Sequence, residues 1–139
     1  KKMKFLILQF LKRLKKILLL LYICNKMLLY YATSKENAES IKRDGFSSEY
    51  LNKRTKYGKA INFTNSYKKA STYDEEVIKV NINTFNCLKL DKIYNMEDDA
   101  DTSRIQRIMM YLKANSNKNC LVNTDDYVFF SEFKYDIIK

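Results

Sequence analysis

Proline and histidine are absent from this sequence of 139 residues, and glycine occurs only twice, as Gly45 and Gly58. Without histidine the chain lacks the usual general base, the usual proton shuttle and the commonest metal ligand. The two glycines are the positions at which unusual backbone geometry is most easily adopted. Any catalysis must therefore depend on other residue types.

The three cysteines, Cys24, Cys87 and Cys120, are odd in number and far apart in the sequence. There is no C-x-x-C pair, and no histidine could complete a zinc site, so we expect neither a disulfide framework nor a bound metal. Buried thiols in a reducing compartment are the simplest alternative. We therefore expect an intracellular, cytoplasmic protein.

Positive charge predominates, with a formal net charge of +10, and it is unevenly distributed. Residues 1–70 hold 17 basic and 4 acidic residues, whereas residues 71–139 hold 9 and 12. Lysine, asparagine, isoleucine and tyrosine are abundant and have A/T-rich codons, so an AT-rich genome explains part of the lysine excess. The basic residues at 12–16 and 53–59 nevertheless make nucleic acid a possible partner.

Residues 3–30 are mostly apolar, with a basic interruption at 12–16. The longest apolar run, Ile17 to Cys24, is much shorter than the ~20 residues needed to span a bilayer. One set of residues alternates steps of four and three, which is typical of a helical stripe: Ile7, Leu11, Leu14, Leu18, Leu21, Asn25 and Leu28.

Such a stripe must be covered by something. Packing against the chain's own domain and docking into a protein or ribonucleoprotein assembly are the favoured alternatives, and an anionic membrane surface is a third. We therefore divide the chain into a basic, leucine-rich docking or anchoring helix at residues 1–26 and a second domain at residues 27–139.

Short strands and helices are predicted to alternate in the second domain, which indicates an α+β fold. Ser34 is a good N-cap for a helix over residues 35–44, and Gly45 ends it. Phe46 is predicted to return to the core, and residues 47–57 to form a loop. Further helices are predicted at 66–73 and 103–114, and strands at 28–31, 60–64, 77–82, 87–90, 127–130 and 135–138.

The order of motifs resembles that of ADP-ribosyltransferases of the poly(ADP-ribose) polymerase and diphtheria-toxin type. Residues 29–34, L-Y-Y-A-T-S, resemble the L-Y-H-G-T-S segment of that family, and residues 35–46 resemble the helix and Gly-Phe that follow it. Residues 57–64, Y-G-K-A-I-N-F-T, are similar to Y-G-K-G-I-Y-F-T. Residues 77–91 resemble a V-I-x-V…L-x-L-D hairpin, and residues 125–130 resemble D-E-Y-V-V-F, the strand with the catalytic glutamate.

This resemblance implies a small ADP-ribosyltransferase-like fold with a split β-sheet and flanking helices, and NAD as the cofactor. The implied NAD-binding positions are Tyr31, Ala32, Thr33, Asn62 and Tyr73. Thr33 matches the family, and Tyr73 matches an aromatic residue that stacks on nicotinamide.

The catalytic triad of the family is His-Tyr-Glu, and its positions correspond here to Tyr31, Asn62 and Asp126. A phenol replaces the imidazole that bonds an NAD ribose, and an amide replaces an aromatic wall. Asp126 keeps the charge but is one methylene shorter, and a shift of ~1 Å in such a group can cost ~100-fold in rate. Ala32 adds a Cβ where the family has glycine.

Fold-determining residues are thus retained, whereas the chemical positions differ. We expect a catalytically inactive ADP-ribosyltransferase-like domain, a pseudoenzyme that acts as a binding or structural module within a larger assembly. The alternatives are an active mono-ADP-ribosyltransferase that modifies a protein or nucleic acid, and a basic nucleic-acid-binding protein.

Overall fold

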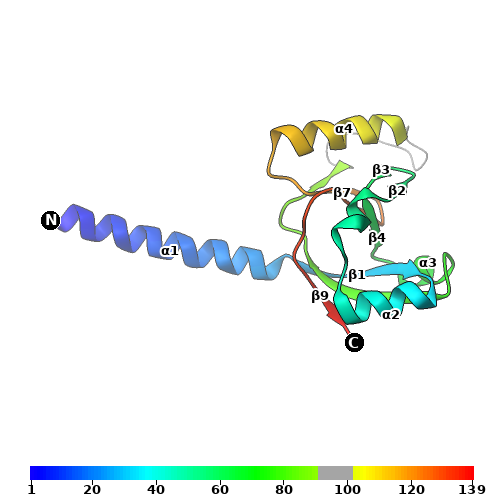
Figure 1. Cartoon of the computed structure of the whole chain (residues 1–139). Helices are drawn as coiled ribbons and strands as arrows, with labels where there is room; N and C mark the ends of the chain where they lie inside the picture. Colours follow the sequence, from blue (N-terminus) through cyan, green and yellow to red (C-terminus); the bar gives the residue numbers. More distant parts are fainter. Residues whose placement is uncertain (91–101) are drawn as a thin grey trace.

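The computed structural model of the chain describes residues 1–90 and 102–139. A long N-terminal helix projects from a body in which shorter helices flank a sheet (Figure 1). The prediction of an α+β fold is therefore confirmed. The described helices are α1 (Lys2–Cys24), α2 (Lys35–Asp44), α3 (Tyr67–Ser71), α4 (Thr102–Asn115) and the 3₁₀ helix η1 (Ser48–Asn52).

The main sheet has seven strands in the order β6-β7-β8-β4-β1-β5-β9. All neighbours are antiparallel except β6 and β7, which are parallel. A separate two-stranded hairpin is formed by β2 (Arg54–Thr55) and β3 (Gly58–Lys59). The sheet strands are β1 (Lys26–Thr33), β4 (Ile61–Thr64), β5 (Glu76–Asn83), β6 (Cys87–Lys89), β7 (Cys120–Asn123), β8 (Asp126–Phe129) and β9 (Tyr135–Ile138).

The two halves of the sheet meet at β1 and β4, where one residue pair, Tyr30 with Thr64, is in register. On one side of this joint β1 pairs with β5 over eight residues, from Lys26 with Asn83 to Thr33 with Glu76. On the other side β4 pairs with β8 over four residues. The sheet is therefore continuous, but its two halves are joined through one register pair between β1 and β4.

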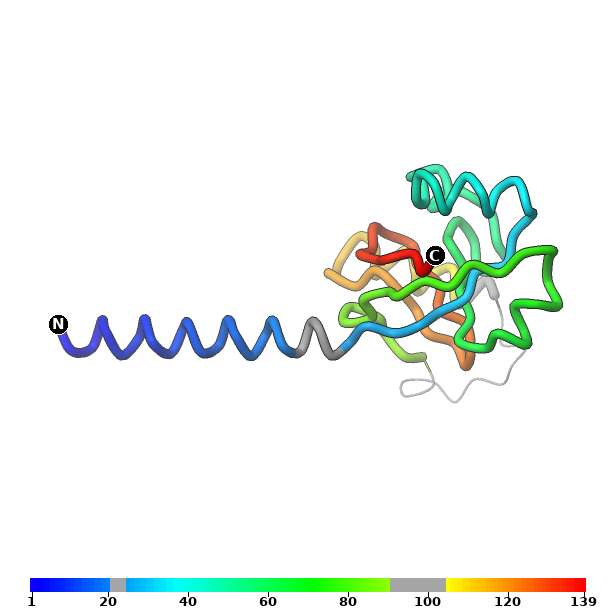
Figure 2. The backbone as a smooth tube through the Cα atoms, turned by 90° about the horizontal axis from the view of Figure 1, so that it is seen from below, coloured from blue at the N-terminus to red at the C-terminus, as the bar shows by residue number. Residues whose placement is uncertain are grey.

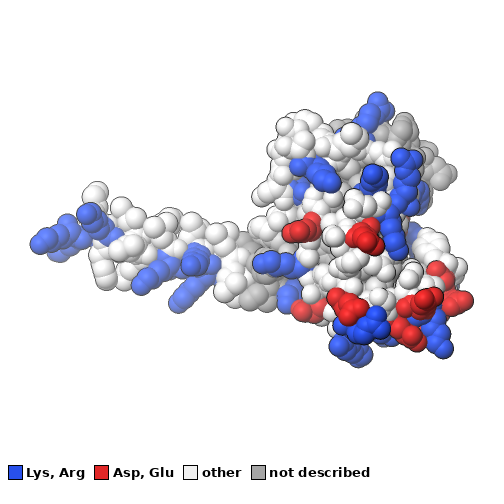
Figure 3. Space-filling model, viewed as in Figure 1, with Lys and Arg blue, Asp and Glu red and all other residues white. Residues whose placement is uncertain are grey.

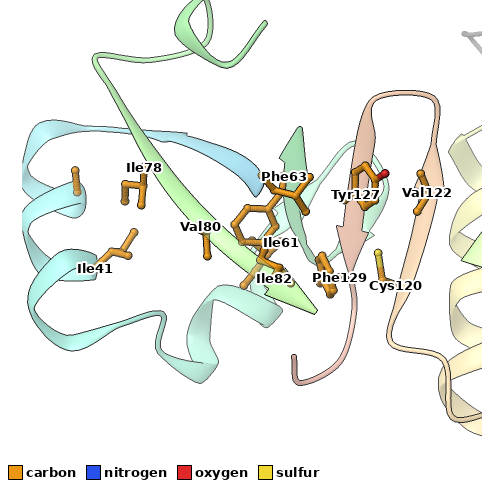
Figure 4. Packing of buried hydrophobic residues seen from close by; sticks show 12 residues of the cluster. Ile41, Ile61, Phe63, Ile78, Val80, Ile82, Cys120, Val122, Tyr127 and Phe129 are labelled. Carbon is orange, nitrogen blue, oxygen red and sulfur yellow. The ribbon is translucent and has the colours of Figure 1, made fainter. Parts of the chain in front are cut away.

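One face of the sheet carries the larger hydrophobic core, which α2 covers with Ala38 and Ile41 (Figure 4). Isoleucine and valine side chains of β5 and the rings of Phe63 and Phe129 fill it. The opposite face packs against α4 through Ile105 and Met109. The alternation of side chains along β8 serves both cores, because a strand presents successive residues to opposite faces.

Edge-to-face aromatic contacts join the larger core to the segment after α2. The Phe46 ring lies 5.3 Å from the ring of Tyr31 and 5.5 Å from that of Phe63. Phe46 also contacts the ring of Tyr135 at 5.3 Å, and its backbone N–H donates to the Tyr135 hydroxyl at 2.7 Å. The prediction that Phe46 returns to the core is confirmed.

The local signals around α2 are also confirmed. The Ser34 hydroxyl accepts a hydrogen bond from the backbone N–H of Asn37 at 3.2 Å, which caps the first turn. Gly45 ends the helix with φ +80°, in the region that favours glycine. A Cβ on Gly45 would lie 2.6 Å from the hydroxyl oxygen of Tyr135.

Three segments differ from the prediction. Residues 47–57 were expected to be a loop, but they contain η1 and the first strand of the hairpin. No strand is predicted in the polar stretch before residue 127, but the structure has β7 there, and its four residues are all buried. Helix α3 is shorter than predicted. The acidic segment 97–101 lies outside the described residues.

The N-terminal helix extends away from the body (Figures 1 and 2). Every residue from Lys1 to Leu20 is exposed, so this part of α1 does not pack against its own domain. The expected alternative of own-domain packing is therefore wrong for residues 1–20. The helix ends at Cys24, so Asn25 and Leu28 of the predicted stripe lie beyond it. Among the described residues, no helix is long and apolar enough to cross a membrane.

Gly45→Ala is expected to lower the free energy of unfolding by about 1–3 kcal/mol through backbone strain, with a further loss from the contact with the Tyr135 hydroxyl. Urea denaturation of Gly45→Ala in the wild-type and Tyr135→Phe backgrounds measures the two parts. The loss should be smaller in the Tyr135→Phe background, because the hydroxyl is gone. An equal loss in both backgrounds would contradict the role of this contact.

Candidate functional site

The candidate site is centred on Asp126, the first residue of β8. Its backbone is in register with Thr64 on β4. Tyr127 and Phe129 belong to the larger core, whereas Val128 packs on the opposite side, so alternation places Asp126 on the face of the smaller core. Only 3% of its surface is exposed. A buried carboxylate at this position requires partners.

Three side chains supply those partners. The Tyr57 hydroxyl donates a hydrogen bond to Asp126 Oδ2 at 2.6 Å, and Lys69 Nζ donates to Oδ1 at 3.1 Å. Lys56 Nζ lies 3.6 Å from Oδ2. The Asn123 amide donates to the Tyr57 hydroxyl at 3.3 Å, which orients the phenol. Both carboxylate oxygens are thus engaged by side chains of the chain itself.

The electrostatics of this group agree with its geometry. Burial lowers the pKa of Lys69, but the hydrogen bond and the charge of Asp126 act in the opposite direction, and the net pKa is raised. Burial and the hydrogen bond to Asp126 raise the pKa of Tyr57 well above its ordinary range. Lys69 therefore stays charged and Tyr57 stays neutral as partners of the carboxylate.

Tyr31 lies on the other face of the sheet. Its ring contacts those of Phe46, Tyr50 and Phe63, all in or against the larger core. Burial, followed by the nearby Tyr50 and Asp74, raises the pKa of Tyr31 to about 12. The structure therefore does not bring Tyr31 together with Asp126, although the resemblance implies that both belong to one triad.

The remaining residues of the predicted site are spread over several environments. Asn62 is half-buried and on the Asp126 face, and its Oδ1 has no hydrogen-bond partner among the described residues. Thr33 is buried at the end of β1, next to the half-buried Ala32. Tyr73 follows α3 and is 60% exposed. The carboxylate of the predicted site, Asp126, is already hydrogen-bonded within the chain.

Sequence reasoning missed Tyr57 and Lys69 as partners of Asp126. They are separated from it by 69 and 57 residues, and neither belongs to the predicted triad. Tyr57 is part of the Y-G-K motif and lies with Lys56 in the turn of the β2–β3 hairpin, directly before Gly58, whose φ is +102°. That glycine was the available signal, because a glycine next to residue 57 indicates a tight turn there.

The basic loop predicted to contact nucleic acid is partly engaged within the chain. Lys53 Nζ lies over the ring of Tyr50 at 4.1 Å, and Lys56 pairs with Asp126. Beside them, a cavity of about 400 Å³ lies between the β2–β3 hairpin and α4, with Met109 and Phe130 as buried apolar walls. Its basic lining residues are Arg54, Lys59 and Lys113. This lining suits an anion that has an apolar part.

Within the described part of the chain, no group of three potential acidic or cysteine metal ligands gathers in one place. Cys87 and Cys120 are free thiols in register on β6 and β7, and burial raises the pKa of the Cys120 thiol.

Asp126→Asn is expected to lower the free energy of unfolding by about 1–3 kcal/mol. It leaves two ammonium groups without their counter-charge, although Lys56 is exposed enough to regain water. Asp125→Asn is the matched control, because Asp125 is exposed, and it should change stability by less than about 0.5 kcal/mol. Equal denaturation midpoints in urea for the two variants would contradict a structural role for Asp126.

A second prediction concerns alkaline pH. Tyr31 holds its proton more tightly in the folded chain, where its pKa is about 12, than in the unfolded chain, where it is 10.0. Its contribution to stability is therefore complete below pH 10 and is lost as the pH rises through 12. Urea unfolding at several pH values above 9 should show a steeper fall for wild type than for Tyr31→Phe. The exposed Tyr111→Phe should behave like wild type, and equal slopes for all three would refute the prediction.

Searches of protein-family models, of curated proteins and of solved structures found no match to this chain.

Proposed function

We propose that this chain is a catalytically inactive ADP-ribosyltransferase-like domain that serves as a binding module and docks through α1. The observation that carries the proposal is the engagement of Asp126 by Tyr57, Lys69 and Lys56. A carboxylate that is 3% exposed and whose two oxygens already have donors offers almost no surface to a substrate.

Support for the fold comes from the order of motifs and from the shape of the sheet. The motifs occur in sequence over about 110 residues, from the strand at β1 to the strand at β8. The sheet is joined at its centre by the single register pair between β1 and β4, which agrees with a split-sheet architecture. The flanking helices α2 and α3 follow the motifs that resemble those of the family.

Support for inactivity comes from the placement of the implied catalytic residues. Asp126 and Asn62 face one core, and Tyr31 is packed among aromatic rings of the other. A transferase needs its polar groups to converge on the reacting bond, since misplacement by ~1 Å is already costly. Neither Tyr31 nor Asp126 meets this requirement.

Support for a binding role comes from α1. Its apolar side chains are exposed over residues 3–20, and a monomeric protein rarely leaves so large an apolar surface uncovered. The helix is therefore the part of the chain best suited to hold the domain in a larger assembly.

Incubation of the full chain with radiolabelled NAD, alone and with a cell extract as acceptor, tests the proposal. We expect no incorporation of label into protein or nucleic acid and no release of nicotinamide above the rate in buffer. Asp126→Ala should give the same result. An incorporation that depends on Asp126 would show an active mono-ADP-ribosyltransferase and overturn the proposal.

A further inference from the structure

Helix α1 has two sides of different chemistry. Eight apolar residues recur at the i, i+3, i+4, i+7 spacing and form an arc roughly 140° wide at 100° per residue. These residues are Met3, Leu6, Ile7, Phe10, Leu11, Leu14, Ile17 and Leu18. Their exposed fractions range from 41% at Leu14 to 77% at Met3, so the body of the chain leaves the whole arc uncovered. We call it the apolar arc.

The opposite side of α1 is basic. At the same angular spacing, all basic residues of the helix lie outside the apolar arc. They are Lys2, Lys4, Lys12, Arg13, Lys15 and Lys16. No acidic residue precedes Glu36 in the sequence, and Figure 3 shows only basic charge on the visible face of α1. The surface that covers α1 must therefore be apolar and carry negative charge.

A second copy of this chain does not meet that condition. In two α1 helices packed through their apolar arcs, Lys4 and Arg13, which border the arc, would lie beside the seam with no acidic residue on either helix to pair with them. Charges beside a helix–helix seam select partners by complementarity, and like charges oppose association. Self-association of α1 is therefore disfavoured by its own charge.

A single protein groove also fits poorly. From Ile17 to Leu20 the helix is apolar on every side, because Leu19 and Leu20 lie outside the apolar arc and are still 58% and 59% exposed. A groove covers one side of a helix, whereas a helix that is apolar all round needs an apolar medium around it. A lipid surface meets the arc with its acyl chains and the remaining apolar residues with the boundary between acyl chains and headgroups, and it can carry anionic headgroups.

We infer that α1 lies in the plane of an anionic lipid bilayer surface, with its apolar arc in the acyl region and its basic side among the headgroups. Apolar insertion combined with attraction to anionic lipid is the usual basis of such binding. The inference rests on the proposed function in one respect, since it takes α1 as the docking element and names what it docks onto.

Flotation of the full chain with vesicles of phosphatidylcholine alone, or of phosphatidylcholine with 30% phosphatidylserine, is the direct test. We expect binding to the anionic vesicles to be at least about tenfold tighter, and to weaken in high salt. The quadruple variant K12A/R13A/K15A/K16A should lose most of this preference. Equal binding to both vesicles, or binding to neither, would overturn the inference.

The helix provides its own matched control for the apolar arc. Phe10→Ser with Leu14→Ser removes two residues of the arc, whereas Phe5→Ser with Leu8→Ser removes the same residue types from the basic side. The first pair should weaken binding to anionic vesicles several-fold more than the second. Equal effects would refute the orientation, and a near-ultraviolet circular dichroism spectrum identical to wild type verifies that the body stays folded.

Two results distinguish this inference from the proposed function. If the chain neither binds vesicles nor turns over NAD, the inference of lipid binding is overturned and the proposal of an inactive domain stands. If the chain binds vesicles and also shows labelling that depends on Asp126, the proposal of an inactive domain is overturned and the inference of lipid binding stands. A dimer that forms through α1 without lipid, seen by analytical ultracentrifugation, would replace the bilayer by a second copy.

Discussion

The buried carboxylate of Asp126 is the constraint on which much of the smaller core depends. A charge with 3% exposure is stable only when its hydrogen-bonding capacity is met by fixed donors. Those donors come from the hairpin, through Tyr57, and from α3, through Lys69. One side chain on β8 thereby ties two peripheral elements, the hairpin and α3, to the sheet. Under the proposed function, the same interactions that stabilise the fold keep the carboxylate from a substrate.

Local sequence signals predicted the fold well where a single residue determines the backbone. Ser34 and Gly45 bounded α2 correctly, because a hydroxyl cap and a glycine with positive φ act within one turn. The strand β7 was not predicted, since its four buried residues show no alternation and follow a polar stretch. The hairpin at Gly58 was missed for a related reason, because its two strands have only two residues each.

The site was less predictable than the fold because it depends on which face of a strand each residue occupies. The resemblance implied that Tyr31, Asn62 and Asp126 act together. The order of motifs along the chain, however, does not say on which face of the sheet each of these side chains lies. The odd-numbered residues of β1 face the larger core, which places Tyr31 beside Phe63 and away from Asp126. The partners that Asp126 does have are set by tertiary contacts across more than fifty residues.

The junction between α1 and β1 has a mechanical consequence. The helix ends at Cys24, and β1 begins at Lys26, so any force applied to α1 passes directly into the first strand. That strand pairs with β5 through eight residues in register, and β5 pairs in turn with β9. A pull along β1 loads these interstrand hydrogen bonds in shear, so that they resist together and do not open one after another. The chain is thus attached to its N-terminal helix through the longest strand pairing in its sheet.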